Sequence, residues 1–234
     1  MDCIKVVIII DNTPESGEDV GDDISYFICK LKNSPNISPV SFYHLKNIDN
    51  WSELQNRLGQ ITRRFSTDNI LTFFFGFGPV GNNFSDYFFL GEYFFSFDSL
   101  YNTLVKYRRG GVSTITIFSN IFDKKQPYKM LVEEQENLST NLVHFGVNVV
   151  GNSNNTNSCL LTRTILAEKL FSYPQDIYDL QRTLQRRIHG KEFDGCNHRC
   201  TFKNFGAFDV IIPPLIPDDT GMKEGKEQVL RVKM

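Results

Sequence analysis

A glycine-rich turn in the middle of the chain has the spacing of a nucleotide-binding loop. Gly76, Gly78 and Gly81 form a G-x-G-x-x-G pattern directly after an apolar run. In a dinucleotide site this pattern opens a helix whose free N–H groups face the pyrophosphate. Here Pro79 removes one donor, and the aromatic residues that follow are typical of loop and strand. We therefore interpret the segment as a tight turn after a strand, with a flavodoxin-like ligand site as the weaker alternative.

Two cysteines and two histidines late in the chain have the chemistry to supply part of a metal site. Cys196, His198 and Cys200 lie close together, and His189 precedes them. A structural zinc site needs four ligands, and no second Cys/His pair lies nearby in the sequence. We therefore predict no metal and no cofactor, and interpret the segment as a polar loop with two reduced thiols.

A cysteine hydrolase needs a thiolate and an imidazole base at neighbouring strand ends. The apolar runs that end near Gly76 and Asn120 carry neither His nor Cys there. Cys159 and His144 flank a later run on opposite sides, so about a strand's length separates them. An active enzyme with a displaced site, Cys159 as nucleophile and His144 as base, is the alternative to a non-catalytic protein.

The apolar pattern predicts the elements that must position these residues. Runs that are apolar on both faces are typical of strands inside a parallel sheet that helices cover on both sides. We predict strands over 4–10, 39–44, 70–75, 112–119, 143–150 and 208–212, a hairpin over 86–97, and helices over 24–31, 51–65, 160–170 and 175–188 and from 98 onward. This order predicts a three-layer α/β/α fold with an open, mostly parallel sheet of about six strands and a small accessory hairpin. In such sheets, sites form at the carboxyl ends of the strands.

Composition and charge argue against several classes of protein. The 234 residues are 41% hydrophobic and 22% charged, which is typical of a folded soluble chain. A net charge of −2 argues against a nucleic-acid binder. No apolar run approaches the roughly 20 residues of a membrane helix, and Asp2 with the short run 6–10 argues against a signal peptide. The 5 cysteines, an odd number, suit reduced thiols, so we expect a cytoplasmic protein.

The order of elements resembles the caspase-like fold that caspases, metacaspases and paracaspases of the peptidase C14 family share. Segment 70–78 (ILTFFFGFG) is similar to the strand that ends in the catalytic His-Gly. Segment 112–121 (VSTITIFSNI) is similar to the strand that ends in the catalytic Cys. Between them, 86–104 is similar to the hairpin and helix of the family, and 160–188 resembles the paired helices of the small-subunit half. The likeness extends from Ile4 to about Leu215.

The same resemblance implies an inactive homologue. The position of the catalytic base holds Phe77, and the position of the nucleophile holds Asn120. Of the family's residues at the site, only Gly78 is retained, and its role is one of the backbone. A phenyl ring cannot transfer protons and a carboxamide is no thiol, so the acyl-enzyme route is lost. The acidic specificity residue of metacaspases and paracaspases would fall near Phe118. The basic specificity residue of caspases would fall in a loop that is acidic here.

The resemblance also implies a domain layout. It makes residues 1–217 a single caspase-like domain and leaves 218–234 as a flexible tail. Within the domain, 1–122 corresponds to the large subunit, 123–142 to the connecting segment and 143–217 to the small subunit.

Finally, the resemblance implies how such a protein would act. Caspase-like enzymes pair through the edge strand of their second half, and here we expect that strand to be 208–212, with Phe208, Val210 and Ile212 as pairing residues. We predict a non-catalytic domain that associates with another protein. It would be a decoy, activator or adaptor for an active caspase-like enzyme, or a homodimer, in apoptosis or immune regulation. The aromatic block 84–97 is a second candidate contact surface, although we favour its burial in the fold.

Overall fold

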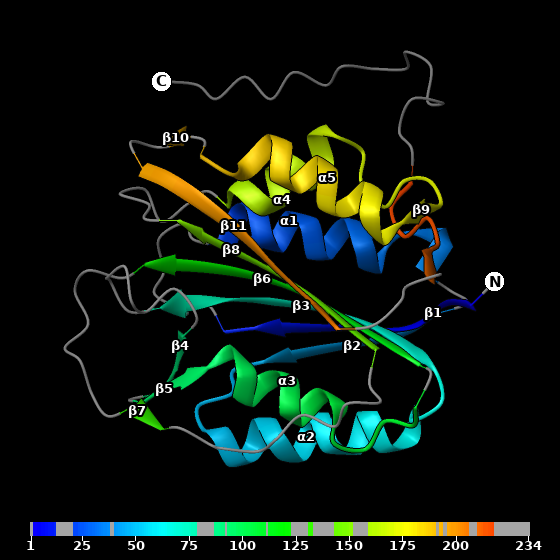
Figure 1. Cartoon of the computed structure of the whole chain (residues 1–234), viewed down its shortest axis with the longest axis vertical. Helices are drawn as coiled ribbons and strands as arrows, with labels where there is room; N and C mark the ends of the chain where they lie inside the picture. Colours follow the sequence, from blue (N-terminus) through cyan, green and yellow to red (C-terminus); the bar gives the residue numbers. More distant parts are fainter. Residues whose placement is uncertain are drawn as a thin grey trace, which may run out of the picture.

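A sheet of mainly parallel strands lies at the centre of the molecule. The computed structural model describes residues 2–12, 21–37, 40–78, 87–91, 93–110, 112–122, 131–132, 143–151, 159–190, 192–193, 196–205 and 210–217. The parallel strands follow the order β2-β1-β3-β6-β8, and Figure 1 shows them: β1 (Asp2–Asp11), β2 (Ser41–Lys46), β3 (Asn69–Gly78), β6 (Ser113–Phe122) and β8 (Val143–Gly151). β11 (Cys196–Phe205) continues the sheet antiparallel to β8.

Helices cover both faces of this sheet. Figure 1 shows α1 (Gly21–Lys32), α4 (Leu160–Ala167) and α5 (Ile177–Ile188) on one face. On the other face lie α2 (Trp51–Arg64) and α3 (Phe97–Val105), and the 3-10 helix η1 (Pro35–Ile37) follows α1. The predicted three-layer α/β/α architecture with a mostly parallel sheet is therefore confirmed.

The alternation of side chains along the strands builds a separate core on each face. Val7 and Ile9 of β1 belong to the core under α1, α4 and α5, whereas Val6 and Ile8 belong to the core over α2 and α3. All four are completely buried. Because strands buried on both faces have no solvent-facing positions, their sequences are continuous apolar runs, which is the pattern that identified them.

The sequence-predicted ends of α2 and of the hairpin agree closely with the structure. The Asn50 side chain caps α2 by accepting a hydrogen bond from the Glu53 N–H at 2.9 Å. β4 (Tyr87–Leu90) and β5 (Tyr93–Ser96) form the hairpin around Gly91, whose φ of +59° favours glycine. A Cβ atom at this position would also lie 2.4 Å from the Asp49 carbonyl oxygen.

The aromatic residues of the hairpin are mostly interior, as we favoured. Phe88 and Phe95 are buried, and Phe95 stacks on Trp51 of α2 with ring centroids 4.8 Å apart. Tyr93 is exposed. Two residues of the expected connecting segment, Leu131 and Val132, form β7 and pair in parallel with β5. The rest of that segment and the expected tail 218–234 lie outside the described residues.

The late part of the chain corrects two predictions. The segment interpreted as a polar loop around Cys196 and Cys200 is the long strand β11. The strand expected over 208–212 spans Val210–Ile212 as β12, and Phe208 lies outside the described residues. β12 pairs with β1 on one side and with β9 (Gln175–Asp176) on the other, so it is not the pairing edge that we predicted.

In the described part of the chain, none of the helices combines the length and the apolar character that crossing a bilayer requires.

Candidate functional site

The carboxyl ends of β3 and β6 lie side by side, as a site between them requires. The parallel register pairs Gly76 with Asn120 and Phe77 with Ile121. Phe77 and Asn120 therefore occupy neighbouring strand ends, one residue out of register. The side chains of both residues lie outside the described part of the structure. The backbone thus places at neighbouring strand ends the two positions that the resemblance singled out.

The glycine-rich turn is built into β3 rather than into a phosphate loop. β3 runs through Gly78, and the next described element is the strand β4, whereas the dinucleotide pattern calls for a helix. A Cβ atom at Gly76 would lie 2.6 Å from the Phe74 ring, so the first glycine of the pattern has a packing role. Asn12 ties the same region together: its N–H donates to the Phe75 carbonyl at 2.8 Å, and its side-chain amide donates to a β4 carbonyl.

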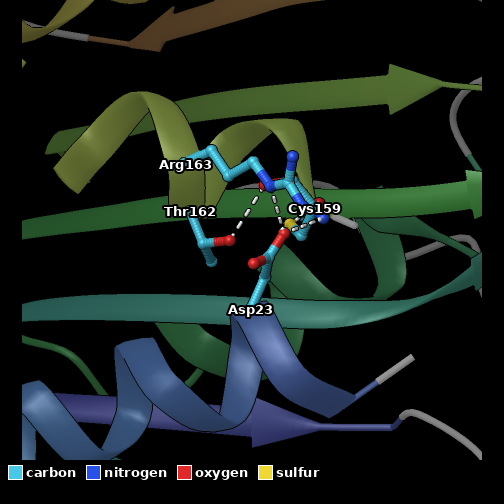
Figure 2. Close-up of polar contacts among 5 residues, drawn as sticks. Asp23, Cys159, Thr162 and Arg163 are labelled. Carbon is cyan, nitrogen blue, oxygen red and sulfur yellow. Dashed lines mark hydrogen bonds and ion pairs between the residues drawn. The ribbon is translucent and has the colours of Figure 1, made fainter. Parts of the chain in front are cut away.

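A polar cluster surrounds Cys159 at the start of α4 (Figure 2). The Cys159 thiol is buried, and its sulfur lies 3.2 Å from the Ser119 hydroxyl of β6. Asp23 of α1 accepts two hydrogen bonds, from the Cys159 N–H at 3.1 Å and from Arg163 Nε at 2.5 Å. The Thr162 hydroxyl donates to the Cys159 carbonyl at 2.9 Å. Among the described side chains, this thiol therefore contacts the Ser119 hydroxyl and no imidazole. The Asp23 carboxylate binds the backbone N–H of Cys159.

The strand register separates Cys159 from the histidine proposed as its base. His144 pairs with Thr114 of β6, while the Cys159 sulfur lies beside Ser119 of the same strand. Five residues of a parallel strand span about 16 Å. Such a separation is too long for proton transfer between an imidazole and a thiol. The structure therefore gives no support to a displaced active site built on Cys159 and His144.

The ends of β1 and β2 bring together a second polar cluster, which the sequence reasoning missed. His44 Nδ1 lies 3.0 Å from Lys32 Nζ, and its Nε2 lies 3.5 Å from the Asp11 carboxylate. Because an ammonium group can only donate, Nδ1 accepts and the ring proton is on Nε2, facing Asp11. Burial, followed by the charge of Lys32, lowers the pKa of His44, although Asp11 opposes this effect. The cluster therefore holds a neutral imidazole.

The candidate zinc ligands are not assembled as a metal site within the described residues. Cys200 points into the core beneath α5, where burial raises the pKa of its thiol to about 12. A thiol with this pKa stays protonated at neutral pH, whereas a zinc ligand must be a thiolate. His189 contacts the backbone of Cys200 rather than its sulfur.

Comparisons with known proteins identify the fold. The sequence matches no protein-family model and no curated protein. Among solved structures, the chain is similar to the crystal structure of caspase-1 from Spodoptera frugiperda, with a TM-score of 0.52 and 10% identity over 93% of this chain and 92% of that one. It is also similar to the structure of pro-sf-caspase-1, with a TM-score of 0.50 and 8% identity over 91% and 94% of the two chains. The likeness covers nearly the whole length of each protein, and this chain therefore has a caspase-like fold.

Proposed function

We propose that this protein is a caspase-like domain without peptidase activity that acts by associating with another protein. The observation that carries the proposal is the pair of residues at the carboxyl ends of β3 and β6. These neighbouring ends hold Phe77 and Asn120 where the caspase-like pattern has histidine and cysteine. Without an imidazole and a thiolate, no acyl-enzyme can form at this place.

The chemistry of the described cysteines supports the same proposal. Cys159 is buried and hydrogen-bonded to Ser119, and Cys200 keeps its proton because of burial. Cys29 is exposed on α1. None of these three thiols combines access to substrate with a base, which nucleophilic catalysis requires.

A caspase-like fold without its catalytic dyad can still bind another protein, and we propose that this is its role. We propose that the partner is an active caspase-like enzyme, which this domain restrains, activates or links to another protein in apoptosis or immune regulation. We also propose a cytoplasmic location, which is consistent with the free thiols of Cys29, Cys159 and Cys200.

Labelling with a thiol-reactive peptide probe tests the missing activity. Because exposed Cys29 would react with any thiol reagent, the experiment uses a Cys29→Ser background and adds Cys159→Ala as the matched variant. We expect no stoichiometric labelling of either protein at neutral pH under native conditions. Stoichiometric labelling that Cys159→Ala abolishes would overturn the proposal, because it would reveal an activated nucleophile at Cys159.

A further inference from the structure

Ser66 lies in the turn that joins α2 to β3. Phe65 is the C-cap residue of α2, and β3 begins at Asn69. Ser66 is half-buried, and Thr67 beside it is exposed. Because β3 carries Phe77 near its carboxyl end, this turn lies at the opposite end of the strand from the candidate site. Ser66 therefore supplies a partly accessible hydroxyl that the site already described does not use.

Two arginines precede this serine at a spacing that protein kinases recognise. The chain contains three Arg-Arg pairs, at 63–64, 108–109 and 186–187, and only the first has a serine or threonine two residues after it. Basophilic serine kinases bind arginines that lie three and two residues before the serine, because carboxylates of the kinase take guanidinium groups in paired hydrogen bonds. The segment 63–66 (RRFS) has this pattern. It indicates Ser66 as the hydroxyl that such a kinase would modify.

The structure leaves both arginines available to a kinase. Arg63 and Arg64 are exposed. The Arg63 guanidinium lies over the ring of Tyr107, 4.0 Å from its centroid, and the Arg64 guanidinium lies 5.2 Å from the ring of the next residue. Within the described part of the chain, the pair at 186–187 is bound to Glu168, whereas no carboxylate binds Arg63 or Arg64. A kinase therefore binds the first pair without breaking an ion pair.

The same corner of the molecule can hold a phosphate once it is attached. The Arg109 N–H donates to the Ser66 carbonyl at 2.9 Å, and the Arg109 side chain is exposed. Arg63, Arg64 and Arg109 thus flank the turn. A phosphate is favoured opposite arginines and disfavoured at the C-terminus of a helix or beside an acidic residue, here Asp68. Because charge-assisted hydrogen bonds to arginine are stronger than the effect of an exposed helix dipole, we expect the pairing to prevail.

We propose that Ser66 is a phosphorylation site for a basophilic serine kinase, and that Arg109, with Arg63 and Arg64, holds the phosphate. The kinase would transfer the γ-phosphoryl group of ATP to the Ser66 Oγ. A P–O bond to serine forms, the P–O bond to ADP breaks, and the hydroxyl proton goes to the catalytic base of the kinase. The half-buried hydroxyl reaches the kinase when the end of α2 frays, since helix ends open at low free-energy cost. The inference goes beyond the proposed associating function and does not depend on it.

Phosphorylation of the folded chain by a purified cyclic-AMP-dependent protein kinase, a basophilic enzyme, tests the site. The full chain is incubated with the kinase and ATP well below its melting temperature, and mass spectrometry locates the phosphate and measures its amount. The variants are Ser66→Ala, Arg64→Ala, Thr67→Ala, which removes the neighbouring hydroxyl, and Arg186→Ala, which changes another Arg-Arg pair. A peptide that spans 60–70 reports recognition of the sequence without the fold.

We expect stoichiometric phosphorylation of the wild-type chain on Ser66 and loss of this phosphate in Ser66→Ala. Arg64→Ala should be modified at least about tenfold more slowly, because a charge-assisted pair with the kinase is lost. Thr67→Ala and Arg186→Ala should behave like wild type. Phosphorylation of the peptide but not of the folded chain would overturn the site. Phosphorylation of neither, an unchanged amount of phosphate in Ser66→Ala, or an unchanged rate in Arg64→Ala would overturn it as well.

The melting temperature of the phosphorylated chain tests the role of Arg109. At low ionic strength we expect phosphorylation to raise the melting temperature of wild type by about 2 °C, because the new pairs join the end of α2 to the segment before β6. The rise should be less than half as large in Arg109→Ala, which keeps Ser66 and both arginines of the kinase motif. Equal rises, or a fall in wild type, would overturn the role of Arg109 and leave the phosphorylation site standing.

Discussion

Arg108 shows how a single buried charge holds three segments of the backbone together. Its guanidinium donates to the carbonyls of Phe65, Asp68 and Ser113, and its Nε donates to the Thr114 hydroxyl at 3.3 Å. Burial lowers the pKa of Arg108 to about 10, against the opposing effect of Asp68, so the side chain remains charged at neutral pH. The contacts join the end of α2 to the starts of β3 and β6.

Replacing Arg108 should therefore destabilise the fold even where charge is kept. Lysine has no planar fork of donors, so Arg108→Lys leaves buried carbonyls unsatisfied and should lower the free energy of unfolding by about 2 kcal/mol. Urea denaturation measures the loss. Arg109→Lys, at a neighbouring exposed position, should change the free energy by less than about 0.5 kcal/mol. Equal stability of the two variants would contradict the structural role of Arg108.

His44 makes the stability of the protein depend on pH. Burial lowers its pKa in the folded state below 6.5, with Lys32 acting in the same direction and Asp11 against it. As the pH falls through about 6.5, the unfolded chain binds a proton that the folded chain does not, so folding stability falls. We expect His44→Gln to lose less stability than wild type between about pH 7.5 and 5.5 in urea denaturation. Equal losses would show that His44 does not contribute.

Among the elements, α4 depends on a cap that another helix supplies. Its own N-cap residue, Cys159, makes no side-chain capping bond. Asp23 of α1 accepts the Cys159 N–H instead and also pairs with Arg163. A residue far away in the sequence therefore accepts the N–H of the N-cap residue, as a Glu or Gln at the third helical position does in a capping box.

Two substitutions at Asp23 should distinguish the stability contributed by its hydrogen bond to the Cys159 N–H from that contributed by its ion pair with Arg163. Asp23→Ala removes both and should lower the free energy of unfolding by about 1 to 2 kcal/mol. Asp23→Asn keeps an oxygen for the Cys159 N–H and should lose about half as much, because an exposed ion pair contributes little. Thermal and urea unfolding measure both. Glu53→Ala on α2 is the control, because the exposed pair of Glu53 with Arg57 should contribute less than about 0.5 kcal/mol. A smaller loss for Asp23→Ala than for Glu53→Ala would contradict the capping role.

The elements that the sequence predicted and those it missed differ in how they are buried. Strands such as β1 are covered on both faces and give an unmistakable apolar run. β11 has a helix-covered face and a sequence of mixed polarity, with Cys200 in the core, so its cysteines and histidine were interpreted as a loop. The resemblance implied that the strand at 208–212 is the pairing edge. The structure instead places β12 between β1 and β9, where Ile212 is completely buried.

In the candidate site, too, one part of the arrangement could be predicted from the sequence and another part could not. The neighbouring places of the β3 and β6 ends followed from sequence, because the carboxyl ends of parallel neighbours meet at one edge of a sheet. The contacts of Cys159 with Ser119 and Asp23 could not be predicted, because they join residues 40 and 136 positions apart in the chain. Such contacts depend on how the helices pack over the sheet, and no local sequence pattern encodes that.

At the scale of the whole molecule, the two expected halves share one core. Phe27 of α1 packs edge-on against Phe73 of β3, with ring centroids 5.2 Å apart, and Phe73 also contacts Phe171, which follows α4. Leu180 and Leu184 of α5 belong to the same cluster. The shared core and the continuous sheet make the chain one scaffold whose packing does not depend on a catalytic dyad. This is what the proposed binding role requires.

Peptide hydrolysis by the purified chain tests the central claim most directly. The measurement uses a mixture of fluorogenic peptides with acidic, basic and apolar residues before the scissile bond, at neutral pH, and compares wild type with Cys159→Ala. Because Phe77 and Asn120 stand at the strand ends where a dyad would lie, we predict that both proteins hydrolyse the peptides no faster than buffer. Turnover by wild type that Cys159→Ala removes would contradict the account.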